Sequence, residues 1–524
     1  MKISIPKKER GNIEFKEFLI PEIHLKEKRK QQLASQMKNR LENGQGKAIY
    51  IVGVKDSGKV RGLNEFEFEQ TLNVLKILAK ENDAVIKKVE RFSENGLYIG
   101  KILIERRIPL KFKEHIIVGI GGHVSSGKST LIGTLITGKA DKDGKNWLYL
   151  NILPHEIERK LTADLHYTFL GFSDGKPICF KNPLDKKEKK IAIEKADKIV
   201  SFIDNVGHDA WIYSSIRGLI GQNLDYGILI VSADDGITSI TKEHFGIMLA
   251  MNLPVIVCIS KIDKVNEKRI EKIEEEISTL IKNVGRIPYS IKNERDIEIV
   301  FDKLETLIPI IRTSSKKFEG FDLLYKFLYL LPSRKKDIDK PFLMYIDKIY
   351  NVPGTGCVVS GSIKQGRLIA GKELLIGPDK EGNFRKVKAK SIEMHYCRLE
   401  KAEAGLIVGI ALRGVKYDEV ERGMVLCEKE LNPKAVKSFE AEILVLNHPT
   451  TISDGYEPVL HLNTIASTVK LKIISKKYLK AGETGKVSMS FKYKPQFIRE
   501  NDKFVFREGK TKGIGTVTKI LKRL

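Results

Sequence analysis

The sequence lacks the features of secreted, membrane-spanning and disordered proteins. Only five of its 524 residues are cysteine, and without a Cys-x-x-Cys pair they exclude a disulfide scaffold or zinc finger. The first ten residues have no apolar signal core, and no stretch approaches the roughly 18 apolar residues of a membrane span. Because 42% of the residues are hydrophobic and 30% charged, a disordered or fibrous chain is excluded. We therefore expect a cytoplasmic protein without membrane contacts.

Acidic residues are scarce at both ends of the chain. Lys and Arg number 92 against 67 Asp and Glu, a net charge of +25. Residues 1–113 carry +10, residues 114–335 only +2 and residues 336–524 carry +13. Basic flanks around a neutral centre indicate a polyanionic partner, most often nucleic acid. A lysine-rich surface from compositional bias is the alternative, and charge alone does not decide between them.

Hydrophobic patterning divides the chain into four predicted domains. Residues 1–113 read as a small basic α+β domain. Residues 114–335 alternate apolar runs with helical stretches, which predicts a mostly parallel sheet with crossover helices. Beyond a charged, Pro-flanked linker, residues 336–431 and 432–524 show short alternating runs punctuated by glycine, which predict two β-barrels. In the first domain we expect helices over residues 25–42 and 65–81 and strands over 47–53 and 97–104.

A phosphate-binding motif lies near the start of the second domain. Residues 122–129, Gly-His-Val-Ser-Ser-Gly-Lys-Ser, follow an apolar strand at 116–120 and open a helix at 130–137, the context that this motif requires. Backbone N–H groups of such a loop wrap phosphates, while Lys128 reaches the β- and γ-phosphates and Ser129 offers a hydroxyl to Mg²⁺. The predicted nucleotide-binding residues here are Gly122, His123, Val124, Ser125, Ser126, Gly127, Lys128, Ser129 and Thr130.

A second stretch imitates this motif without its context. Residues 53–60, Gly-Val-Lys-Asp-Ser-Gly-Lys-Val, match its first seven positions but end in valine, which has no hydroxyl for a metal. The residues that follow do not begin a helix. We interpret this segment as a strand that runs into an Asp-Ser-Gly turn and reject it as a nucleotide site.

Four further candidates lie where a bound nucleotide would meet moving loops. Asp204 follows the strand 199–203 and is placed to hold the shell of a magnesium ion, while the Gly207 backbone N–H can meet the γ-phosphate. His208 would then stand near the attacking water. Thr162 precedes a strand, in the position where a switch loop closes on the metal.

Residues 260–263, Ser-Lys-Ile-Asp, end a later strand and are candidates for base recognition. The carboxylate of Asp263 can accept from both N1–H and N2–H of guanine, which adenine does not offer. Thr-Ser-Ser at 313–315 ends the last strand of the domain and can support the base. Because these motifs follow one another at successive strand ends, they predict an α/β P-loop GTPase domain that binds GTP or GDP. The predicted base-side residues are Ser260, Lys261, Asp263, Ser314 and Ser315.

At these residues the sequence resembles the translational GTPases, such as elongation factor Tu and elongation factor one alpha. Residues 122–130 resemble their Gly-His-Val-Asp-His-Gly-Lys-Thr-Thr loop, and residues 204–208 their Asp-x-x-Gly-His motif. The chain is still more similar to the GTP-binding protein one and two family, elongation-factor-like GTPases with an added N-terminal domain. That similarity covers nearly the whole chain and is carried by residues 36–46, 155–158, 241–244 and 440–453.

The resemblance implies a role for each matching residue. Lys128 would bind phosphates, Ser129 and Thr162 would ligate Mg²⁺, Asp204 would hold the metal shell, and His208 would position the hydrolytic water; Val124 and Leu161 match apolar residues that screen this histidine. The sequence departs from the elongation factors in three places: Ser125 replaces Asp, Asn205-Val206 replaces Thr-Pro, and Ser260 replaces an Asn that would contact the base. Guanine selectivity therefore rests more heavily on Asp263.

These observations lead to competing functions. The first is a monomeric GTP-hydrolysing factor that binds tRNA and acts on the ribosome, in elongation or ribosome rescue. The second is a GTP-switched adaptor that recruits RNA-processing or RNA-decay proteins, motivated by the basic helix of the N-terminal domain. A third, the GTPase subunit of a sulfate-activating enzyme, leaves the N-terminal resemblance unexplained.

Overall fold

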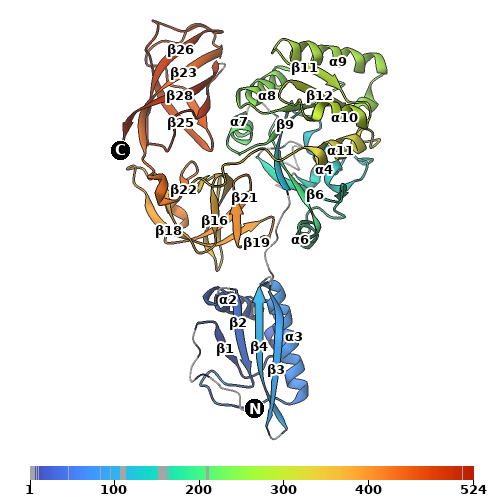
Figure 1. The fold of residues 1–524 in the computed structure, drawn as a ribbon, viewed down its shortest axis with the longest axis vertical. Coiled ribbons are helices and arrows are strands. Elements are labelled where there is room, and N and C mark those ends of the chain that lie inside the picture. Colours follow the sequence, from blue (N-terminus) through green and yellow to red (C-terminus); the bar gives the residue numbers. More distant parts are fainter. Residues whose placement is uncertain are drawn as a thin grey trace. The chain divides into compact units, whose positions relative to one another are not determined.

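A computed structural model of the chain describes residues 6, 9, 11–44, 46–82, 84–94, 96–106, 114–150, 162, 164–207, 212–509 and 511–524, with the side chains of 94, 106 and 212–215 left aside. The chain forms two compact units, Met1–Pro109 and Leu110–Leu524 (Figure 1). In the described part of the chain, no helix has both the length and the apolar character needed to cross a membrane.

The first unit is a four-stranded sheet with helices packed on it (Figure 1). Its core forms where Leu33, Met37 and Leu41 of one helix meet Leu72 and Leu75 of another. Both predicted helices and both predicted strands are confirmed, whereas the strands at either edge of the sheet were not predicted. The sheet order is β1-β2-β4-β3, and the elements are β1 (Ile13–Lys16), α1 (Pro21–His24), α2 (Glu27–Asn43), β2 (Lys47–Val52), α3 (Glu65–Glu81), β3 (Ala84–Glu94) and β4 (Leu97–Arg106).

The segment that imitates a phosphate loop is a turn in this unit. Val54 and Val60 pair as an isolated antiparallel bridge, and Gly53 and Gly58 both have φ of +83°. The next helix, α3, begins only at Glu65, so no helix N-terminus faces the turn. The rejection of this segment as a nucleotide site agrees with the structure.

The second unit begins with the predicted α/β domain, the G domain. Its eight-stranded sheet has the order β11-β12-β10-β9-β5-β8-β6-β7 and is parallel except for β6 and β7 at one edge. The strands are β5 (Glu114–Gly122), β6 (His166–Ser173), β7 (Lys176–Ile178), β8 (Lys198–Asp204), β9 (Tyr226–Ser232), β10 (Val255–Ser260), β11 (Ile287–Ser290) and β12 (Leu307–Arg312). The helices are α4 (Lys128–Thr137), α6 (Lys186–Lys195), α7 (Ile212–Ile220), α8 (Ser239–Ala250), α9 (Glu267–Lys282), α10 (Glu294–Phe301) and α11 (Phe321–Leu330).

The order of the parallel strands brings the sequence motifs together. Strand β5 lies between β8 and β9, and β10 pairs with β9. All four run in the same direction, so the loops after their carboxyl ends meet at one edge of the sheet. That edge therefore carries the phosphate motif after β5, Asp204 at the end of β8 and Ser260 at the end of β10.

Two β-barrels follow, here called barrel II and barrel III. In barrel II the sheet β13-β22-β17-β18-β21-β15-β14 closes through an additional pairing of β13 with β15, and barrel III closes as β23-β26-β25-β24-β27-β28. Barrel II contains β13 (Leu343–Tyr345), β14 (Lys348–Val352), β15 (Gly356–Gln365), β16 (Arg367–Ile369), β17 (Glu373–Gly377), β18 (Arg385–Met394), β19 (Cys397–Leu399), β20 (Lys401–Glu403), β21 (Ile407–Arg413) and β22 (Val425–Cys427). Barrel III contains β23 (Val436–Asn447), β24 (Val459–Leu462), β25 (Ile465–Ile473), β26 (Thr484–Phe491), β27 (Lys503–Glu508) and β28 (Thr511–Arg523).

Candidate nucleotide site

The phosphate motif forms a loop between β5 and α4. Gly122, at the end of β5, has φ of +141°, and a side chain there would collide with the carbonyl oxygen of Ile230 on β9. Gly127 has a left-handed conformation with φ of +91°, and α4 begins at the next residue, Lys128. The two glycines thus allow the chain to turn sharply and place a helix N-terminus over the loop.

The side chain of Lys128 folds back over this loop. Its Nζ donates hydrogen bonds to the carbonyl oxygens of Gly122 at 3.2 Å and His123 at 2.7 Å. Burial lowers the pKa of Lys128 to about 8, because the charged form loses its hydration. A phosphate group is a stronger acceptor than either carbonyl, so the position suits an ammonium that binds a polyphosphate.

Three oxygen-bearing side chains meet at the start of α4. The hydroxyl of Ser129 donates to Oδ2 of Asp204 at 2.5 Å and lies 3.1 Å from Oγ1 of Thr162. Two hydroxyls and one carboxylate are hard oxygen donors of the kind that Mg²⁺ prefers, with room left for phosphate and water oxygens. The predicted trio therefore fits the ion.

Gly207 packs directly against the phosphate loop. A Cβ atom at this position would lie 2.6 Å from the backbone nitrogen of Val124 and 2.7 Å from the carbonyl carbon of His123. Only glycine permits this close approach of the backbone to the phosphate loop. The predicted catalytic residue His208 lies outside the described residues, as does Leu161, one of the two apolar residues expected to screen it.

The base-side candidates separate into two groups. Ser314 donates to Oδ1 of Asp263 at 2.6 Å and so fixes the carboxylate proposed to read guanine. The hydroxyl of Ser260 instead donates to the carbonyl oxygen of Ser126 at 2.6 Å. Ser260 thus ties β10 to the phosphate loop, a role that the sequence did not reveal. Lys261 lies within 3.4 Å of the carboxylate of Asp234, and the Ser315 carbonyl accepts from the backbone N–H of Asp141.

Sequence reasoning missed a histidine beneath the phosphate loop. Nδ1 of His244, on α8, accepts a hydrogen bond from the backbone N–H of Gly122 at 2.9 Å. Burial lowers the pKa of His244 to about 3, so the ring is neutral and can accept this bond. The preceding residue, Glu243, pairs with Arg507 and Lys512 of barrel III. The Thr-Lys-Glu-His run at 241–244 was the available signal, although it suggested no role.

A charged network connects the Thr162 segment to barrel II, and it too was missed. The carboxylate of Asp164 pairs with Arg217 of α7 and with Nζ of Lys348 of β14, the latter at 3.2 Å. Burial opposes ionisation of Asp164, but Lys348 and Arg217 outweigh this effect and lower its pKa to about 2. Asp347, adjacent to Lys348, accepts from the hydroxyl of Tyr167 at 2.6 Å. The sequence could not reveal these partners because they lie far apart along the chain.

A phosphate loop at the end of a central parallel strand, with an oxygen trio beside it and a supported carboxylate on the base side, defines a P-loop GTPase. The family description "Elongation factor Tu GTP binding domain" matches residues 113–334. "Elongation factor Tu domain 2" matches residues 356–427, and "Elongation factor Tu C-terminal domain" matches residues 432–521. The chain therefore belongs to the elongation factor Tu-like family of GTPases.

Two relatives extend the similarity into the first unit, and a third matches a smaller part of the chain. GTP-binding protein 1 of Xenopus laevis is 33% identical over 498 residues, which cover 93% of this chain and 76% of the relative. GTP-binding protein 2 of Homo sapiens is 32% identical over 536 residues, covering 98% and 88%. Elongation factor 1-alpha of Pyrococcus horikoshii is 29% identical over 418 residues, covering 75% and 89%.

Solved structures share the fold of this chain. A bacterial selenocysteine-specific elongation factor has a TM-score of 0.58 at 20% identity, over 77% of this chain but only 58% of that protein. Elongation factor SelB from Methanococcus maripaludis, in complex with the GTP analogue GppNHp, has a TM-score of 0.57 at 19% identity, over 79% and 80%. At this level of identity the likeness concerns the fold alone.

Proposed function

We propose that this GTPase binds tRNA and acts on the ribosome, in elongation or ribosome rescue. One observation carries the proposal: a nearly neutral GTPase domain is joined to two barrels of the elongation factor type, and the region from residue 336 onward carries +13. Lys and Arg contacts to phosphates would give salt-dependent affinity that is largely independent of sequence. A ribosomal site of action places the protein in the cytoplasm, where it would work as a monomer.

We propose the following roles within the site. Lys128 and the amides of the phosphate loop bind the β- and γ-phosphates, and Ser129, Thr162 and Asp204 hold Mg²⁺, which neutralises phosphate charge when it is bound. The Gly207 N–H senses the γ-phosphate. His208 orients the hydrolytic water, and Asp263 accepts from guanine with support from Ser314. The same reasoning favours four domains, residues 1–113, 114–335, 336–431 and 432–524.

The test is GTP turnover with and without ribosomes, repeated with charged and uncharged tRNA. Ribosomes should accelerate turnover strongly, because positioning and electrostatics supply most of the catalysis of phosphoryl transfer. His208→Ala should abolish this stimulation while nucleotide affinity is retained. His448→Ala, which replaces a histidine of barrel III, is the matched control. If ribosomes do not raise turnover, or if His208→Ala behaves like the control, the proposed mechanism is wrong.

The adaptor hypothesis gains support from the compactness of Met1–Pro109 as a separate unit. A domain that folds apart from the GTPase can bind a partner of its own. GTP-dependent retention of RNA-processing proteins by the full chain, without stimulation by ribosomes, would favour this function over the first.

A further inference from the structure

We propose that β25, β26 and the loop between them form an RNA-binding surface on barrel III, which contacts the phosphate backbone of a single strand. The inference rests on the proposed function and adds the place at which RNA is held. Residues 465–494, which span this hairpin, contain eight lysines and one acidic residue, Glu483. A net charge of +7 in 30 residues is more than half of the +13 carried by residues 336–524.

The two strands present their lysines on one face of the barrel. Alternate residues of β25, including Leu471 and Ile473, are buried in the core. Lys470 and Lys472 alternate with them and are exposed. They lie opposite Ser490 and Ser488 of β26. Because successive side chains of a strand point to opposite faces, the lysines share one surface with short serine hydroxyls between them, which leaves the ammonium groups accessible.

Most of these eight lysines form no ion pair with the described acidic residues. Lys476 pairs with Glu483 at 3.5 Å, and Lys492 with Glu457 at 2.6 Å. Among the described residues, no acidic side chain lies within ion-pair distance of the four lysines that we call the lysine surface: Lys470, Lys472, Lys477 and Lys480. These four cations form no direct ion pair, although Glu457 interacts with Lys470 and Glu483 with Lys480 at longer range. The lysines still repel one another, and a polyanion would relieve that repulsion.

The neighbouring face of the same barrel is different. On β23 and β28, Glu440 lies directly opposite Lys519. Glu442 of β23 faces Lys486 of β26. Acidic and basic residues therefore alternate on that face, as on an ordinary solvated sheet. Lys519 faces Glu440 and Lys522 faces Ser438 on these strands. Because both lysines lie outside β25, β26 and the loop between them, the pair serves as a control for lysines elsewhere on barrel III.

The loop after β25 adds an exposed aromatic ring to the surface. Tyr478 is 48% exposed, and Nζ of Lys480 lies 5.7 Å from the centre of its ring. The loop is fixed because the next residue, Leu479, is buried and forms a bridge with Ile452. A ring held at the end of a basic strip is typical of proteins that stack an unpaired base while lysines follow the backbone. This arrangement favours single-stranded RNA.

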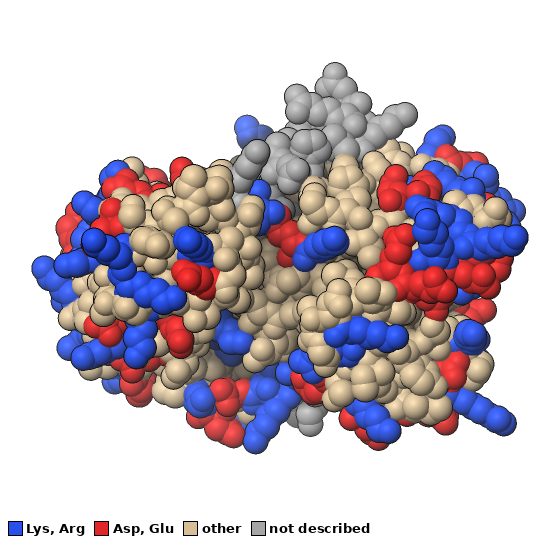
Figure 2. All heavy atoms as spheres, turned by 90° about the horizontal axis from the view of Figure 1, so that it is seen from above, with Lys and Arg blue, Asp and Glu red and all other residues tan. Residues whose placement is uncertain are grey.

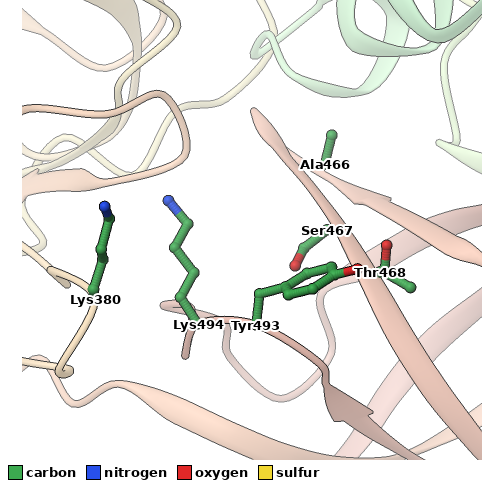
Figure 3. A pocket seen from close by; sticks show the side chains of 6 residues that line it. All are labelled: Lys380, Ala466, Ser467, Thr468, Tyr493 and Lys494. Carbon is green, nitrogen blue, oxygen red and sulfur yellow. The ribbon is translucent and has the colours of Figure 1, made fainter.

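The opposite end of the hairpin is a pocket of about 390 Å³ between barrels II and III. In Figure 3 the side chains of Lys380 and Lys494 run side by side, and the ring of Tyr493 lies next to Ser467 and Thr468. Both lysines here share Glu421: Lys494 pairs with it directly and Lys380 lies 4.0 Å away. The pocket therefore contributes less uncompensated charge than the lysine surface.

The wider surface is consistent with this assignment. Figure 2 shows many Lys and Arg side chains at the outer edge of the barrel III side, at the left of the view. Asp and Glu side chains lie among them on this side as well as on the G-domain side at the right. The net charge is +13 over residues 336–524 but only +2 over residues 114–335, so a partner that binds through phosphates would meet less repulsion on the barrels than on the G domain.

The test is the salt dependence of binding to a fluorescent 20-nucleotide poly(U) RNA. Each phosphate contact on a single strand contributes about 0.7 to the slope of log K against log salt. We expect Lys470→Ala/Lys472→Ala to reduce that slope by about 1.4, whereas the control Lys519→Ala/Lys522→Ala leaves it unchanged. Tyr478→Ala should weaken binding by roughly five- to a hundred-fold, the loss of one stacked base, at unaltered slope.

The lysine surface would be refuted by an unchanged salt slope in Lys470→Ala/Lys472→Ala, by an equal reduction of the slope in the control variant, or by binding to phosphatidylserine vesicles but not to RNA. Thermal unfolding confirms that each variant is folded, since exposed lysines contribute little to stability. A blunt RNA duplex that binds as tightly as poly(U) would refute the single-strand assignment. Ribosome-stimulated GTP turnover is measured in a separate assay. A negative result there would refute the ribosomal function without refuting RNA binding by the lysine surface, and a negative RNA-binding result would leave the ribosomal function open.

Discussion

Asp164→Asn is the substitution that best tests how the Thr162 segment is held. The asparagine keeps the shape of the side chain but removes the charge shared by Arg217 and Lys348. Asp164 lies two residues beyond Thr162, whose hydroxyl is 3.1 Å from that of Ser129. If the ion pairs hold this segment in place, their loss should release Thr162 from the site.

The free energy with which these ion pairs hold the Thr162 segment follows from the pKa of Asp164. A change from the usual 3.8 to about 2 corresponds to roughly 2.5 kcal/mol. The carboxylate is 41% exposed, and solvent screening reduces the contribution of such a pair by about half, to roughly 1.2 kcal/mol. The equilibrium between the held and the released position of the Thr162 segment should therefore shift towards release by about eight-fold in the variant.

The assay is equilibrium binding of fluorescent GTP and GDP analogues. We expect the affinity for the GTP analogue to fall by up to about eight-fold and that for GDP by less than two-fold, because the Thr162 segment reaches only the γ-phosphate and the metal. Asp143→Asn, which removes an exposed carboxylate of the same domain, is the control. Lys348→Met combined with Asp164→Asn should add little to either single effect. Equal losses for both nucleotides, or fully additive substitutions, would refute the reasoning.

Three further predictions concern other parts of the G domain. Gly207→Ala should weaken GTP-analogue binding by at least about tenfold while GDP binding is largely retained, since the added methyl group meets the backbone of the phosphate loop. Equal losses of affinity in titrations of the two nucleotides would contradict this prediction. Asp263→Asn should lower GTP affinity and raise that for xanthosine triphosphate, whose C2 carbonyl accepts from the amide; competition binding measures the switch, and unchanged preference would exclude Asp263 from the base site. His115 donates from Nδ1 to the Gly405 carbonyl and accepts at Nε2 from Ser201, both at 2.9 Å, and burial lowers its pKa to about 4. Between pH 6.5 and 4 the unfolded chain binds more protons than the folded one, so the free energy of unfolding should decrease by up to about 3 kcal/mol as the pH is lowered. Denaturant titrations should show a smaller decrease in His115→Asn. An identical pH profile in this variant would count against His115 as the cause.

The phosphate side of the site was readable from the sequence because its chemistry is local. Residues 122–129 lie on one turn, and the strand before it and the helix after it are visible as apolar patterns. The strand ends that carry Asp204 and Ser260 were equally visible, since buried parallel strands are short apolar runs. Their convergence followed from the rule that parallel strands end at one edge of the sheet.

Local patterns did not reveal roles that depend on a partner elsewhere in the fold. Ser260 occupies a base-recognition motif, yet its hydroxyl reaches the Ser126 carbonyl, and His244 lies 122 residues from the loop that it supports. The edge strand β3 went unpredicted because its residues 87–90, Lys-Lys-Val-Glu, interrupt the alternation expected of a strand, and a register shift occurs there.

The sequence by itself determined the class of the protein, the order of its domains and the place of the phosphate loop, because these depend on residue types at short, fixed spacings. Only the tertiary structure decided which charges are compensated. Lys494 and Lys492 have carboxylates supplied by distant segments, whereas no acidic side chain in the described part of the chain lies within ion-pair distance of Lys470 or Lys472. A net charge of +25 says nothing about this difference, because compensation depends on distances across the fold and not along the chain.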